Sequence, residues 1–200
     1  MNKKYQIIYA DPPWKFGSKQ YRDGGRTFQD IEEKYNTMHI EDIEDIDINS
    51  ITDNDCACFM WSTDAHLKEA INLLEKWGFA YKTIAFVWLK KYNTGTTVVK
   101  FAPWTLKSTE ICLLGIKGKM GKYKKSNKVR QFVEAERTIH SRKPDEVRDR
   151  IVKLFGDLPR IELFAREDKQ LNFNGKTIFD GWDVWGNEVE SDIKITKEDE

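Results

Sequence analysis

The stretch Tyr5–Trp14, with the sequence YQIIYADPPW, constrains the fold of this chain more than any other segment. It begins as a nearly continuous run of β-branched and aromatic residues and stops abruptly at Asp11. Such a run followed by two prolines is typical of a buried strand that ends in a stiff turn. Because ligands of open α/β sheets bind at the carboxyl ends of the strands, we expect this turn to face a ligand crevice.

The turn itself offers hydrogen-bond acceptors beside an aromatic ring. Pro12 and Pro13 remove two backbone donors, so the carbonyls of Asp11 and Pro12 are expected to stay free, next to the Asp11 carboxylate. Acceptors beside the face of Trp14 suit a planar group that carries an NH2 substituent, such as a nucleobase with an exocyclic amine. A plain turn with a tryptophan in the core is the alternative interpretation of these four residues alone.

The rest of the chain alternates strand and helix patterns. Apolar runs predict further strands, and amphipathic stripes predict helices: strands at 56–61, 79–90, 110–116 and 160–165, helices at 65–77 and 143–155, and a short helix or series of turns within 37–51. This alternation predicts an α/β fold with a parallel-type sheet and helices on both faces. We expect one domain over residues 1–188, followed by a charged tail, 189–200, that frays.

Charge is distributed unevenly along the chain. Lys and Arg number 33, as do Asp and Glu, so the net charge is zero and overall basicity does not indicate a nucleic-acid partner. Residues 117–130, however, are rich in Lys and Arg and contain no acid. A flexible basic segment of this kind can contact phosphates, although a solvated loop is the alternative. The candidates for such contacts are Lys122, Lys124, Lys125 and Arg130.

Other function classes are excluded by what the sequence does not contain. It shows neither a secretory leader nor an apolar run long enough for a membrane span, so we expect a cytoplasmic protein. The three cysteines lie inside apolar runs and are expected to be buried free thiols. Neither they nor the three histidines have the spacing of metal ligands, so we expect no metal.

Four motifs occur in an order that identifies a family. They are DPPW at 11–14, SRKPDE at 141–146, IELFAR at 161–166 and WGNE at 185–188. From about Tyr5 to Glu188 the chain resembles the MT-A70 family of S-adenosylmethionine-dependent adenine-N6 methyltransferases, which includes the catalytic subunit of the eukaryotic mRNA methyltransferase and many bacterial and phage enzymes. The resemblance implies a Rossmann-like methyltransferase sheet in a permuted order, with the catalytic turn ahead of the cofactor strand.

The resemblance also implies roles for individual residues. Asp11 and Pro12 would hold the adenine amine, with Pro13 and Trp14 walling the base pocket. Tyr35 and Glu110 match positions near the substrate. The positions that match cofactor-binding residues are Asp11, Lys143, Arg166, Asn187 and Glu188. Two positions depart from the mRNA enzyme, which has glutamine in place of Glu188 and histidine in place of Asp168.

The reaction that the resemblance implies is transfer of the methyl group of S-adenosylmethionine to N6 of adenine in a nucleic acid. We expect DNA rather than RNA, because the chain shows no additional RNA-binding domain and its compact size is similar to that of bacterial and phage members. The alternatives are an RNA adenine-N6 methyltransferase, a cytosine-N4 methyltransferase and a non-catalytic scaffold subunit of a methyltransferase heterodimer. The intact DPPW turn argues against the scaffold. A homodimer or a heterodimer with a related subunit is compatible with the sequence, which locates no interface.

Overall fold

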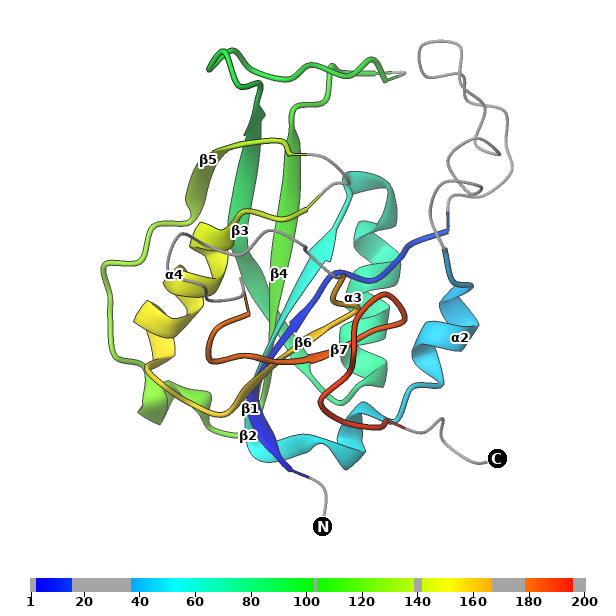
Figure 1. Cartoon of the computed structure of the whole chain (residues 1–200), viewed down its shortest axis with the longest axis vertical. Helices are drawn as coiled ribbons and strands as arrows, with labels where there is room; N and C mark the ends of the chain where they lie inside the picture. The colour runs from blue at the N-terminus through cyan, green and yellow to red at the C-terminus, as the bar shows by residue number, and fades with distance from the viewer. Residues whose placement is uncertain (1–2, 16–36, 103, 139–141, 167–178, 196–200) are drawn as a thin grey trace.

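The structure, a computed structural model of the chain, describes residues 3–15, 37–102, 104–138, 142–166 and 179–195. Within these residues, seven strands form one sheet in the order β5-β3-β4-β2-β1-β6-β7 (Figure 1). The strands are β1 (Tyr5–Ala10), β2 (Thr52–Ser62), β3 (Ala80–Lys91), β4 (Thr109–Lys117), β5 (Phe132–Glu136), β6 (Arg160–Leu163) and β7 (Asp183–Trp185). The helices are α2 (Ile40–Glu44), α3 (Leu67–Lys76) and α4 (Asp145–Phe155), with 3-10 turns η1 (Ile48–Ser50), η2 (Asp64–His66) and η3 (Met120–Tyr123).

Strand β1 lies between two parallel neighbours, β2 and β6. Strands that are covered on both faces have near-continuous apolar sequences, which is the pattern that predicted β1. The α/β sheet with helices on both faces is confirmed: α2 and α3 lie on one face and α4 lies on the other (Figure 1). The chain leaves β1 toward β2 along one face and reaches β6 from the other, so the carboxyl ends of β1 and β6 form a topological switch point.

The direction of β4 differs from the parallel arrangement that the sequence suggested. It runs antiparallel to both β2 and β3. A parallel pair needs a long crossover, usually a helix, whereas the connection from β3 to β4 contains no helix among its described residues and returns as a hairpin. The start of β4 therefore lies at the same sheet edge as the ends of β1, β2 and β3. The short strands β5 and β7 were not predicted.

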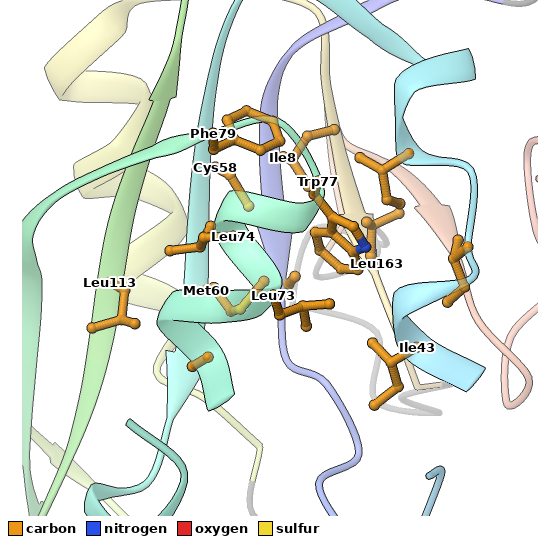
Figure 2. Close-up of a cluster of buried hydrophobic side chains, with 14 of the residues drawn as sticks. Ile8, Ile43, Cys58, Met60, Leu73, Leu74, Trp77, Phe79, Leu113 and Leu163 are labelled. Atoms are coloured by element: carbon orange, nitrogen blue, oxygen red, sulfur yellow. The ribbon is translucent and has the colours of Figure 1, made fainter. Parts of the chain in front are cut away.

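The face under α2 and α3 is packed with apolar side chains from the central strands. Figure 2 shows Ile8 of β1, Met60 of β2 and Leu163 of β6 beneath Leu73 of α3 and Ile43 of α2, and each of these five side chains is completely buried. Cys56 and Cys58 pack on this face and Cys112 packs on the opposite one, and all three are free, buried thiols, as predicted. The burial of these apolar side chains thus holds α2 and α3 against this face of the sheet.

The opposite face is packed by α4, whose buried stripe is Val147, Ile151 and Phe155. These residues cover Ile7 and Tyr9 of β1. Both point to the opposite face of the sheet from Ile8, the β1 residue labelled in Figure 2. Because α4 starts shortly after Lys143, this packing also fixes where Lys143 enters the site. No helix among the residues that the structure describes is long and apolar enough to cross a membrane.

Candidate active site

The Asp-Pro-Pro-Trp turn follows β1 directly at the switch point. Its backbone is partly self-paired, because the Trp14 amide donates to the Pro12 carbonyl at 2.9 Å and the Met38 amide donates to the Pro13 carbonyl at 3.0 Å. The expectation that the Pro12 carbonyl would be entirely free was therefore wrong. A carbonyl oxygen has two lone pairs, so Pro12 still has one acceptor position for a ligand.

Trp14 is a buried wall of the turn. Its side chain is 8% exposed, and its indole N–H donates to the Trp61 carbonyl at 3.1 Å. The ring of His66 stacks on it, with centroids 5.6 Å apart and an interplanar angle of 14°. One face of Trp14 is therefore covered by protein, and the residue holds the turn against the end of β2.

Four charged side chains form a row beside the turn, which we call the charge row: Asp11, Lys143, Glu110 and Lys90. The Lys143 ammonium lies 2.7 Å from Asp11 Oδ2 and 3.4 Å from Glu110 Oε2. The other Glu110 oxygen pairs with Lys90 at the end of β3. Acids and bases alternate along the row, and the side chains of its three inner members are between 9% and 14% exposed. Asp11, at 28%, is the member that faces solvent.

Electrostatics keeps Lys143 and Glu110 ionised, whereas burial lowers the pKa of Lys90 in spite of its pair with Glu110. Burial alone would lower the pKa of Lys143, but the charges of Asp11 and Glu110 outweigh it and raise that pKa. Burial would raise the pKa of Glu110, yet the neighbouring ammonium groups of Lys143 and Lys90 lower it. At neutral pH Lys143 is thus a cation that orients carboxylates and is not available as a base.

The ionised Glu110 should make stability depend on pH. Because its pKa in the folded chain lies below its ordinary value of 4.5, the unfolded chain binds this proton more readily. The carboxylate therefore stabilises the fold above about pH 4.5, and that contribution is lost as pH falls through the folded pKa. We expect Glu110→Gln to lose less stability than the wild type between about pH 6 and about pH 3.5, measured as the urea midpoint. Equal losses in both proteins would contradict the ion pairing.

A second group of predicted residues meets on the other side of the turn, in a pocket. Arg166, three residues past the end of β6, forms a parallel bridge with Glu188, and its Nε lies 4.0 Å from Glu188 Oε2. The pocket is lined by Pro13, Met38, Phe164, Ala165, Arg166, Asn187 and Glu188. Residues of the motifs DPPW, IELFAR and WGNE thus meet in one place.

The backbone around the pocket is tightly constrained. A Cβ at Gly186 would lie 2.4 Å from the Ala165 carbonyl oxygen, so only glycine allows the two segments to approach this closely. Phe164 adopts a positive φ of 59°, a conformation that costs energy in a non-glycine residue, and its ring packs edge-on against Trp185 at 5.7 Å. Strain of this kind is typical of binding sites and persists where the surroundings hold it in place.

The pocket combines apolar walls with a guanidinium, an amide and a carboxylate. This set suits a nucleoside joined to an amino acid: apolar groups for the base, a carboxylate for ribose hydroxyls, and a cation for a carboxylate of the ligand. The pocket lies beside the same turn as Asp11, because Pro13 lines it. A methyl donor and a base amine could therefore meet at the turn.

Two of the predicted positions, Tyr35 and Asp168, lie outside the described residues. Of the basic candidates, Lys122, Lys124 and Lys125 lie in and after η3, which follows the carboxyl end of β4. Because β4 is antiparallel, that end is at the opposite sheet edge from Asp11.

At that opposite edge Lys122 pairs with Asp55, near the start of β2, at 2.6 Å. Arg130 precedes β5 beside α4, where its carbonyl accepts a hydrogen bond from Arg150 at 2.6 Å. The structure does not bring the four basic candidates together with the charge row. Their contact with phosphates stays a prediction, for a stretch of nucleic acid away from the methylated base.

Lys90 was not predicted as a site residue, because it ends an apolar run and resembles the polar flank of a strand. A usable signal was present, since a lysine that is buried in a sheet needs an acidic partner, and Glu110 begins the next predicted strand.

Comparison with known proteins places these features in context. The MT-A70 family model matches residues 5–188. A type II methyltransferase, M.MunI of Mycoplasma sp, is 40% identical over 94% of this chain and 78% of its own length. The N(6)-adenosine-methyltransferase MT-A70-like protein of Arabidopsis thaliana is 28% identical, and the N(6)-adenosine-methyltransferase catalytic subunit METTL3 of Homo sapiens is 26% identical. The matches cover 81% and 82% of this chain but only 22% and 26% of these longer proteins.

Proposed function

Since the chain belongs to the MT-A70 family and is an adenine-N6 methyltransferase, we propose that it moves the methyl group of S-adenosylmethionine to adenine in DNA. The observation that carries the proposal is the position of the Asp-Pro-Pro-Trp turn, whose Asp11 belongs to the charge row and whose Pro13 lines the pocket of Arg166 and Glu188. DNA is favoured because the type II methyltransferase, a class of enzymes that modify DNA, is the more identical relative and is mostly covered by this chain.

The proposed reaction needs no strong base, but it requires that the amine nitrogen and the methyl group are positioned accurately. The adenine amine is a weak nucleophile, since its lone pair is delocalised into the ring. In the proposed reaction Asp11 and the Pro12 carbonyl accept hydrogen bonds from the two amine protons, which favours the pyramidal nitrogen that attack requires. S-adenosylmethionine, when bound, supplies a methyl group already activated by a sulfonium, so no strong base is needed first.

The proton balance is then simple. The amine nitrogen forms a bond to the methyl carbon as the carbon–sulfur bond breaks, and one amine proton leaves to Asp11 or to water. Lys143 keeps the Asp11 carboxylate oriented at 2.7 Å, which lowers the cost of arranging the site at the moment of reaction. In a duplex the adenine must leave the base stack, at a cost of roughly a few kcal/mol, which a single strand avoids.

The pocket residues are assigned to the cofactor. We assign Glu188 to the ribose hydroxyls, Asn187 to polar groups of the nucleoside and Arg166 to the ligand carboxylate. Glu188→Ala should weaken S-adenosylmethionine binding about tenfold or more, the size of a lost hydrogen bond to a charged group. Glu188→Gln keeps an acceptor oxygen and should retain most of the affinity. Isothermal titration calorimetry measures both variants, and equal affinity of Glu188→Ala and wild type would remove Glu188 from the site.

The test of the proposed function is incubation with isotope-labelled S-adenosylmethionine and matched single-stranded DNA, duplex DNA and RNA, followed by nucleoside mass spectrometry. Label in N6-methyladenine, highest on DNA, is the expected result. Label on RNA alone would overturn the choice of polymer, and label on cytosine would overturn the base assignment. We also propose that the protein works in the cytoplasm, where its donor and nucleic acid are both present.

A further inference from the structure

A hairpin-like segment, Tyr92–Lys107, joins β3 to β4 and extends past their ends (Figure 1). We call it the arm. Its base is held by a hydrogen bond from the Val98 amide to the Lys90 carbonyl, and its outer part is closed by two bonds between Lys100 and Lys107, all at 2.8 Å. Val98 is buried and anchors the arm to the domain. The described residues of the arm thus form a projection, and we call the part beyond Lys100 and Lys107 its tip.

The tip exposes large apolar side chains close together. Phe101 is 82% exposed, Trp104 is 94% exposed and Leu106 is 59% exposed. Single exposed apolar residues are ordinary, but a cluster on a projecting segment indicates a binding surface. Phe101 and Trp104 bury little of their surface in the fold and belong to neither core cluster, so their presence points to a ligand that covers them.

The base of the arm is part of the active site. Lys90 and Glu110, which are ion-paired in the charge row, flank the arm on its two sides in the sequence. A ligand on the arm therefore extends from the edge of the sheet where Asp11 lies. A polymer whose reactive base is at Asp11 must continue past this edge, and the arm is positioned to contact its neighbouring nucleotides.

The positive charge of the arm indicates which kind of ligand it binds. From Leu89 to Thr109 the chain carries four lysines and no acid: Lys90, Lys91, Lys100 and Lys107. Lys91 and Lys107 pair with Glu134 and Asp64 outside the arm. Lys100 lies within ion-pair distance of no carboxylate among the residues that the structure describes. A two-fold contact between the arms of two copies would bring two Lys100 side chains into one interface without a carboxylate partner, whereas a phosphate of a nucleic acid complements Lys100.

We propose that the arm binds the strand that carries the target adenine, with unpaired bases next to it stacked on Phe101 and Trp104 and a phosphate on Lys100. Stacking on an aromatic side chain tolerates any base, so the arm adds affinity for unpaired nucleotides and does not read a sequence. This inference rests on the proposed function, because it takes a nucleic acid as the substrate.

The test measures binding of a 20-mer single-stranded DNA, with one central adenine, by isothermal titration calorimetry. Phe101→Ala with Trp104→Ala should weaken binding about tenfold or more, while S-adenosylmethionine affinity stays unchanged. Trp104→Phe keeps an aromatic face and should stay within about threefold of the wild type. The matched control is Phe132→Ala, which removes an aromatic side chain that is 49% exposed on β5, outside the arm, and should leave both affinities unchanged.

Each outcome bears on the inference. If the wild type and the double variant bind DNA equally well, the arm does not bind the strand, and the proposed function stays intact. A wild type that binds S-adenosylmethionine but no nucleic acid overturns both. Analytical ultracentrifugation of the same proteins tests the alternative ligand, a second copy of the chain. A dimeric wild type and a monomeric double variant with equal DNA affinity would make the arm a self-association surface.

Discussion

Asp11→Ala should lose at least roughly a hundredfold in turnover, the size typical of removing one preorganised group that acts in the transition state. The carboxylate is the solvent-facing member of the charge row and accepts from Lys143 at 2.7 Å. Its removal takes away an acceptor for the amine and also releases Lys143. Single-turnover methylation of DNA at saturating S-adenosylmethionine measures the effect directly.

Two further variants separate these contributions. Asp11→Asn keeps an acceptor oxygen but loses the charge, so an intermediate loss is expected. Asp55→Ala is the matched control, since it removes an ion-paired aspartate at the opposite edge of the sheet, 2.6 Å from Lys122. The control should stay within about twofold of wild-type single-turnover methylation at saturating DNA, because Asp55 contacts neither the charge row nor the pocket. Turnover of Asp11→Ala within about threefold of the wild type would remove Asp11 from the reaction, since roughly a hundredfold is expected.

Arg148→Met should lower the free energy of unfolding by about 3 to 5 kcal/mol, because it leaves Glu162 as an uncompensated buried charge. The guanidinium of α4 binds this carboxylate of β6 in two places, with Nε to Oε2 at 2.6 Å and Nη2 to Oε1 at 2.8 Å. Both side chains are almost completely buried. Urea denaturation followed by circular dichroism measures the loss.

The same helix supplies the control for this prediction. Arg150→Met breaks an ion pair with the exposed Glu146 and hydrogen bonds to two backbone carbonyls, so it should cost less than about 2 kcal/mol. Adding Glu162→Leu to Arg148→Met should recover part of the loss, because no charge is then left buried. A single Arg148→Met variant no less stable than Arg150→Met would contradict the energetic role of the buried pair.

Much of the fold could be predicted because burial patterns are local. The apolar run of β1 and the prolines after Asp11 determined the central strand and its turn from ten residues of sequence. The direction of β4 was missed, although the evidence was local too: residues 92–107 show no helical stripe that could serve as a crossover. Strand β5 was missed because its alternation covers only five residues and follows a basic loop.

The site was harder to predict, because it depends on which charges meet across the sheet. A sequence pattern indicates that Glu110 starts a strand and that Lys90 ends one, but their contact follows from the antiparallel register of β3 and β4. The surroundings of Trp14 were hard to predict for the same reason, because they too depend on contacts between distant segments. The position of Trp14 beside the turn predicted contact with the base, which stays a prediction, but it did not indicate that the His66 side chain, from a distant segment, covers one face of the ring.

The exposure of Trp104 gives the protein an optical signal of its own. Of its seven tryptophans, Trp104 is 94% exposed, while the others are buried or half-buried. The red edge of the emission spectrum should therefore come from the tip of the arm. Anything that covers the tip will quench that edge or shift it to the blue, so occupancy of the arm can be followed on unlabelled protein while the rest of the spectrum reports on the core.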